Sequence, residues 1–132
     1  MENINLVRHS YKGDCIFLLK DLTDKIKEIT IEEKEELIRS GVSYSEMISK
    51  ESIPSKDIKN IFLNILNRDK KLIAYYVAKI SEIIYRQKGN KLVIVSLARA
   101  GTPYGILIRK YLKLKYKVDI PHYSISIIRD KG

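Results

Sequence analysis

The chain of 132 residues is about the length of one domain, and its composition, 45% hydrophobic and 31% charged, is that of an ordinary globular protein. It has one cysteine, no signal-peptide layout at its N-terminus and no apolar run of the roughly 18 residues that a membrane helix needs. We therefore expect a protein of the reducing cytoplasm, without an internal disulfide and without a membrane partner. The net charge is +9, and most of it comes from the C-terminal quarter, where the residues from Arg99 onward include eight basic and two acidic ones. A positive field of this kind favours binding of phosphate-bearing small molecules or RNA.

Helical patterns fill most of residues 1–89. The capping-box pattern, a Ser or Thr followed three residues later by Glu, occurs at Thr30 and Ser43, and apolar residues recur at helical spacing further along the chain. The helices that these patterns predict cover 14–22, where a buried strand is the alternative, then 30–41, 43–49, 55–66 and 70–87, with 67–69 interrupting or bending the last two.

A nearly unbroken apolar run over 93–97 predicts a strand that is covered on both faces and lies at the centre of a parallel sheet. Pro103 suits the first position of the helix that follows, and Thr102 is its expected N-cap. A second strand, over 122–129, completes a right-handed βαβ unit.

We therefore predict a single α/β domain with an N-terminal helical layer over 1–89 and a βαβ unit over 90–132. One βαβ unit supplies only two strands, whereas a parallel sheet with an apolar central strand normally has more. We interpret the chain as a fragment, either truncated or natural, whose incomplete sheet leaves an unpaired edge. A homodimer, or exchange of the C-terminal strand, would cover that edge.

The turn between the first strand and its helix is the leading candidate for a ligand site. Positive charge, small residues open to close backbone approach and a helix N-terminus coincide there, although a tight turn without a ligand is the alternative. The predicted anion contacts are Arg99, Ala100, Gly101 and Thr102. Arg129 and Lys131 follow the second strand, at the sheet edge where open α/β sheets bind ligands, and are further candidates for phosphate contacts.

Cys15 is the only thiol of the chain, and His9 and His122 are its only histidines. This set permits a Cys–His pair for nucleophilic catalysis. A cysteine within an apolar run is more often buried and unreactive, so the thiol is the weaker candidate. Two histidines and one cysteine do not make a zinc site, and no metal site is predicted.

The segment VSLARAGTPYG resembles the pyrophosphate loop of type I phosphoribosyltransferases, with Arg99, Ala100 and Gly101 at the basic-small-small positions. Ala100 stands where that loop more usually has glycine. The segments SYKGDCIFLLKDLT and IPHYSISIIRDKG resemble a bacterial family of phosphoribosyltransferase-like proteins that is associated with tellurite resistance and stress and carries the label StiP cysteine protease.

The resemblance implies a type I phosphoribosyltransferase-like fold that binds pyrophosphate or phosphoribosyl pyrophosphate through Arg99–Gly105. It implies no cofactor in the protein itself, and Mg²⁺ accompanying the ligand if the enzyme is active. The acidic ribose-binding loop of those enzymes is absent from the sequence, so we expect no transferase turnover from this chain. Two other functions remain open, namely an RNA- or partner-binding module that uses the same basic field, and a thiol protease that uses Cys15.

Overall fold

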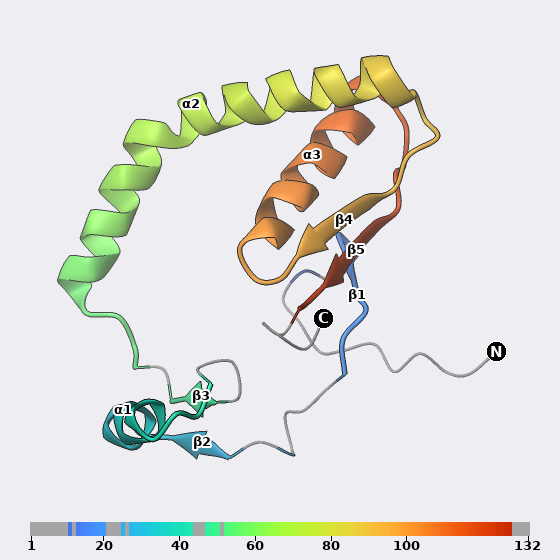
Figure 1. Cartoon of the computed structure of the whole chain (residues 1–132). Helices are drawn as coiled ribbons and strands as arrows, with labels where there is room; N and C mark the ends of the chain where they lie inside the picture. Colours follow the sequence, from blue (N-terminus) through green and yellow to red (C-terminus); the bar gives the residue numbers. More distant parts are fainter. Residues whose placement is uncertain are drawn as a thin grey trace. The chain divides into compact units, whose positions relative to one another are not determined.

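The computed structural model describes residues 11, 13–20, 25, 27–43, 47–50 and 52–127. They form a mixed α/β structure with three helices and two small parallel sheets (Figure 1). The chain divides into two compact units, one made of Met1–Lys20 and Leu63–Gly132 and the other of Asp21–Phe62. We call them unit 1 and unit 2 and describe each by itself.

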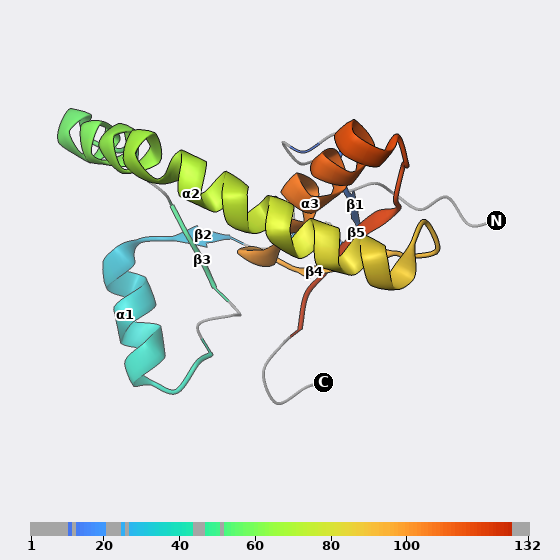
Figure 2. The ribbon, with the colours of Figure 1, turned by 90° about the horizontal axis from the view of Figure 1, so that it is seen from above.

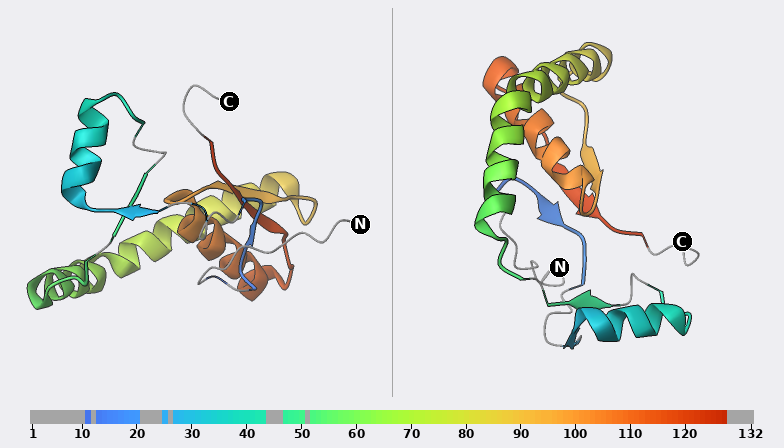
Figure 3. Two further views of the ribbon diagram at one scale, coloured as in Figure 1. Left: turned by 90° about the horizontal axis from the view of Figure 1, so that it is seen from below. Right: turned by 90° about the vertical axis from the view of Figure 1, so that its left-hand side faces the viewer.

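Unit 1 is built on a three-stranded parallel sheet in the order β1–β5–β4. Its strands are β1 (Ile16–Phe17), β4 (Ile94–Leu97) and β5 (His122–Ile125). Helix α3 (Gly101–Tyr116) connects β4 to β5 and runs alongside both strands (Figures 1 and 3). The predicted βαβ unit is therefore confirmed.

Two predictions about the strands of unit 1 are wrong. The apolar run after Asp14 is not a helix, because its backbone bonds to β5 instead, with Leu18 N donating to Ser124 O at 2.9 Å. The strand over 93–97 lies at the edge of the sheet as β4, and β5 takes the central place because β1 pairs with its free side.

Helix α3 begins at Gly101, two residues before the predicted first position at Pro103. Its N-cap residue is Ala100, which has no capping side chain. Thr102 was the expected N-cap, but its side chain is buried and its hydroxyl lies 2.8 Å from Ser124 Oγ. A hydrogen bond to the neighbouring strand has therefore replaced the cap.

Helix α2 (Lys56–Lys88) is one continuous helix. The sequence predicted that 67–69 would interrupt or bend it; no interruption occurs, and the helix bends partway along its length (Figure 1). Residues 67–69 contain neither glycine nor proline, and Arg68 and Asp69 pair with each other on the surface, so nothing in them stops the helix. The start at Ser55 is confirmed, because its hydroxyl accepts from Ile58 N at 3.3 Å. Gly89 ends the helix with a positive φ of 62°. Figure 2 shows α2 passing over α3.

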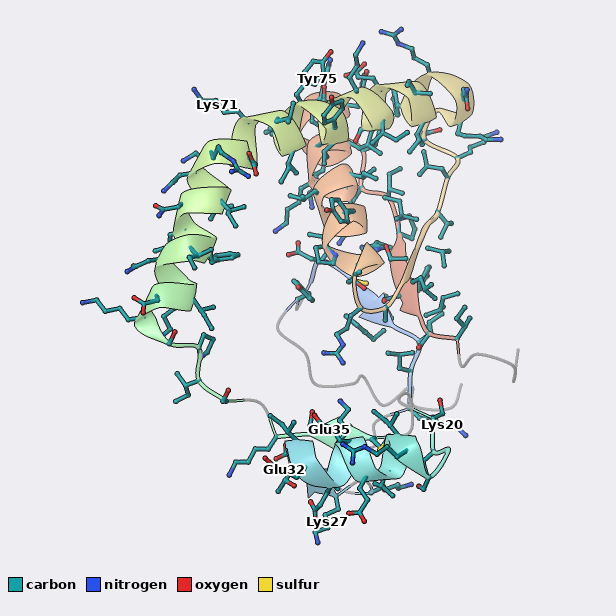
Figure 4. All side chains as sticks on the ribbon, turned by 60° about the vertical axis from the view of Figure 1, so that its left-hand side comes forward. Lys20, Lys27, Glu32, Glu35, Lys71 and Tyr75 are labelled. Atoms are coloured by element: carbon teal, nitrogen blue, oxygen red, sulfur yellow. The ribbon has the colours of Figure 1, made fainter. Side chains whose placement is uncertain are left out.

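Unit 2 contains helix α1 (Ile31–Arg39) and a two-stranded parallel sheet of β2 (Glu28–Ile29) and β3 (Ile48–Ser49). The predicted capping box of α1 is confirmed: Thr30 Oγ1 accepts from Glu33 N at 3.1 Å, and Glu33 Oε2 accepts from Thr30 N at 2.8 Å. Glu32 and Glu35 of α1 are exposed (Figure 4).

The predicted helix over 43–49 is wrong where it can be compared. Residues 44–46 lie outside the described part, and Ile48 and Ser49 pair with β2 as a strand. None of the helices in the described ranges is long and apolar enough to cross a membrane.

Candidate functional site

The side of the unit 1 sheet that α3 covers is lined by buried polar side chains, which are Ser96, Thr102, His122 and Ser124. Ser96, His122 and Ser124 point to this face because every second residue of a strand does so, whereas Thr102 reaches it from α3. They bond to one another in pairs. Ser96 Oγ lies 2.8 Å from His122 Nε2, and Thr102 Oγ1 lies 2.8 Å from Ser124 Oγ.

Gly105 lets α3 lie directly on the Ser96–His122 pair. A Cβ atom at this position would overlap Ser96 Oγ and His122 Nε2, and it would lie 2.8 Å from His122 Cε1. The missing side chain therefore makes room for the hydrogen bond between strand β4 and strand β5.

The partners of His122 define its tautomer. Nδ1 lies 3.2 Å from the carbonyl oxygen of Asp14, which only accepts, so Nδ1 carries the ring hydrogen. Nε2 then accepts the hydroxyl hydrogen of Ser96. Burial is the main cause that lowers the pKa of His122, and the charge of Arg109 lowers it further, while the Asp14 carbonyl acts against them. The imidazole is neutral at pH 7.

Cys15 directly precedes β1 (Ile16–Phe17) in the sequence. Ile16 pairs with Tyr123, and this pairing of β1 with β5 brings the segments of Cys15 and His122 side by side. The cysteine is 5% exposed, and its Sγ lies 3.8 Å from the carbonyl oxygen of Ile16. Burial raises the pKa of the thiol, and Arg109 opposes this rise. A thiol whose pKa lies above its ordinary value keeps its proton at neutral pH.

Arg109 of α3 bonds to both of the turns that precede strands β1 and β5. Its Nη1 donates to the Gly13 carbonyl at 2.7 Å and its Nη2 to Asp119 Oδ1 at 2.7 Å, which anchors the turns that precede β1 and β5. The hydrogen bond from Arg109 is the main cause that lowers the pKa of Asp119. Lys110 reinforces the first contact, with Nζ 2.8 Å from Asp14 Oδ2.

The predicted anion contacts differ in exposure. Arg99 and Ala100 are exposed in the turn after β4, Gly101 opens α3, and the Thr102 hydroxyl is turned inward to Ser124. Arg129 and Lys131, the predicted phosphate contacts, and His9 lie outside the described residues.

Sequence reasoning missed Ser96, Gly105 and Arg109. A signal exists for the first two, because a serine within an otherwise apolar strand and a glycine one turn into an amphipathic helix both indicate a close, polar helix–strand contact. Arg109 gives no such signal, since it belongs to a run of basic residues. Within the described ranges, no group of three or more His, Cys, Asp or Glu residues could hold a metal ion.

The fold and the site define a mixed α/β protein in which a lone cysteine is buried directly before β1 and a histidine is buried on the neighbouring β5, under a helix. The sequence profile of one family, described as "Tellurite-like stress resistance cysteine protease StiP", matches residues 9–132. The chain belongs to this family. It is also 34% identical over 125 residues to "Cysteine protease StiP" of Acinetobacter baylyi (strain ATCC 33305 / BD413 / ADP1). No solved structure matches the chain.

The match to the Acinetobacter protein covers 93% of this chain but 32% of that relative, so the chain spans about a third of the length of the curated protein it matches. The resemblance to the StiP family and its association with tellurite and stress are thus confirmed. The resemblance to type I phosphoribosyltransferases is not supported. The structure shows a mixed α/β fold with small parallel sheets.

The main functional expectation, binding of pyrophosphate or phosphoribosyl pyrophosphate through the Arg99–Gly105 loop, is wrong. The family and the relative are both described as cysteine proteases and neither as a transferase. Mg²⁺ was expected only as a companion of bound phosphoribosyl pyrophosphate, so that expectation has no separate support. The alternative that uses the thiol of Cys15 agrees with the family better.

Proposed function

We propose that this chain is the thiol-bearing part of a cysteine peptidase, with Cys15 as the nucleophile and His122 as its base. The observation that supports the proposal is that the only cysteine in the sequence is buried directly before β1, whose neighbour β5 carries the buried His122. The name of the Acinetobacter relative supports the same class of reaction.

In this reaction the thiol proton passes to an imidazole nitrogen while the sulfur attacks the carbonyl carbon of a peptide bond. The imidazolium then returns the proton to the leaving amine, and water cleaves the thioester. Burial raises the pKa of the Cys15 thiol, and the positive charge of Arg109 favours the first step because it opposes that rise. His122 can accept the thiol proton only after its ring has turned, because Nε2 faces Ser96 of β4, on the side of β5 away from β1, and Nδ1 already donates its hydrogen to the Asp14 carbonyl.

Hydrolysis of fluorescently labelled casein by the whole chain tests the proposal. We expect turnover by the natural sequence and its loss to background in Cys15→Ala and in Cys15→Ser, whose hydroxyl is a far weaker nucleophile at neutral pH. Ser124→Ala is the matched control, because this residue belongs to the same buried polar layer but bonds to Thr102 instead of His122. Turnover that survives in Cys15→Ala, or a folded natural chain that cleaves no casein, would refute the proposal.

A further inference from the structure

The face of the unit 1 sheet that points away from α3 is open and apolar. Where Ser96 is buried against the helix, its strand neighbours Val95 and Leu97 are 58% and 47% exposed. Leu18, which follows β1, is 49% exposed, and Ile125 at the end of β5 is 36% exposed.

These side chains form a continuous surface because the strands are in register. Val95, Tyr123 and Ile16 pair across the three strands and make one row. In a parallel ladder, residues that pair in this way point to the same face. Leu97 pairs with Ile125 in the next row, and the bond from Leu18 N to Ser124 O brings Leu18 beside them. We call the six residues of these two rows the open sheet face: Ile16, Leu18, Val95, Leu97, Tyr123 and Ile125.

The chemistry of the face indicates what covers it. Parallel sheets are normally covered by helices on both faces. Among the described residues, α3 packs on the face of Ser96 and His122, and Val95 and Leu97 on the opposite face are exposed. Contiguous exposed apolar surface on a protein marks an interaction site. The element that normally covers such a face is a helix that presents an apolar stripe to the sheet.

Two lysines at the rim of the open sheet face favour a helix with acidic flanks. The alternation of exposed residues continues outward from β4 to Lys91 and from β1 to Lys20. Since β1 and β4 run parallel, Lys91 at the start of one strand and Lys20 at the end of the other lie at diagonally opposite corners. The nearby carboxylates of Asp14 and Asp119 are already paired, with Lys110 and Arg109 of α3.

A second copy of this chain fits that rim poorly, because its lysines would meet lysines on a protein of net charge +9. We propose that the open sheet face is the docking site of an amphipathic α-helix with an apolar stripe and acidic flanks, supplied by another polypeptide segment. The inference does not depend on the peptidase activity, since none of its residues takes part in that chemistry.

Two synthetic helical peptides of the same length test the proposal against the whole chain. Both carry leucines at i, i+3, i+4 and i+7, and their flanks are glutamates in one and lysines in the other. Fluorescence anisotropy should show saturable binding of the glutamate peptide that weakens with salt, and much weaker binding of the lysine peptide. Val95→Lys should weaken binding about tenfold or more, because it places a charge within the apolar contact.

Leu114→Lys is the matched control, since Leu114 is 74% exposed on α3 and lies off the open sheet face. It should leave the affinity unchanged, and the circular dichroism spectra of both variants establish that they are folded. The proposal is overturned if neither peptide binds, if both bind equally, or if Leu114→Lys and Val95→Lys act alike. It is also overturned if light scattering shows a dimer that Val95→Lys dissociates, because a second copy would then be the occupant.

Discussion

At the scale of single residues, Gly105 controls how closely α3 approaches the sheet. A glycine inside a helix usually destabilises it by roughly 1 kcal/mol relative to alanine, so helix propensity alone would favour a substitution here. The contact with Ser96 and His122 opposes it, since a Cβ atom would overlap both side chains. The two effects have opposite signs, which makes this position informative.

We expect Gly105→Ala to destabilise the protein by about 1–3 kcal/mol, the usual cost of adding a methyl group where there is no room. Gly101→Ala is the matched control in the same helix, because the nearest atoms to its Cβ would be at 3.9 Å, an ordinary contact distance. Urea unfolding followed by circular dichroism gives both free energies. Equal values for the two variants would show that α3 does not press on the Ser96–His122 pair.

At the scale of elements, Glu82 joins α2 to α3. Its carboxylate accepts hydrogen bonds from Tyr111 Oη at 2.7 Å, from Tyr116 Oη at 2.5 Å and from Lys115 Nζ. The rings of Tyr85 and Tyr116 stack beside it with their centroids 3.8 Å apart. The bond from Lys115 is the main cause that lowers the pKa of Glu82 to about 2, and it raises the pKa of Lys115 to about 12.

The contribution of Glu82 should therefore disappear in acid. Its pKa rises to about 4.5 on unfolding, so its stabilising effect is complete above that pH and is lost as the pH falls towards 2. Glu82→Gln should lower the urea midpoint at pH 7, and the gap to the natural chain should close between about pH 4.5 and pH 2.

Glu35→Gln serves as the control for that experiment, because Glu35 is exposed and its ion pair with Arg39 spans 3.4 Å. Exposed pairs of this kind contribute little, so its midpoint should stay close to that of the natural chain at every pH. A gap for Glu82→Gln that stayed constant down to pH 2 would show that the lost effect is packing rather than charge.

Elements with local signals were predictable, and elements that depend on distant partners were not. Helix α1 follows from its capping box, and most of α2 follows from its apolar periodicity. Strands β1 and β3 have two residues each, and β1 exists because it pairs with Tyr123 and Ser124 more than a hundred positions along the chain. No local pattern distinguishes such a run from one turn of helix.

At the scale of the whole molecule, the candidate site could be predicted only in part. The sequence indicated Cys15 and His122 only because they are the single thiol and one of two histidines, whereas the pairing of β1 with β5 brings their two segments side by side. The turn at Arg99–Thr102 was predicted to bind an anion because of its charge and its small residues. Thr102 in fact serves the buried polar layer through Ser124, a partner that only the folded sheet supplies.

The sequence shows no linker and predicts one domain. The structure divides into two compact units, and α1 belongs to unit 2. Thr30→Ala removes the hydroxyl that accepts from Glu33 N, which should cost about 1 kcal/mol. By hydrogen exchange, the amides of α1 should then exchange about fivefold faster, while those of α3 keep their rates if unit 1 opens independently. Ser40→Ala, at the other end of α1, keeps the capping box intact and provides the comparison. Equal acceleration in α1 and α3 would mean that the two units unfold as one cooperative domain.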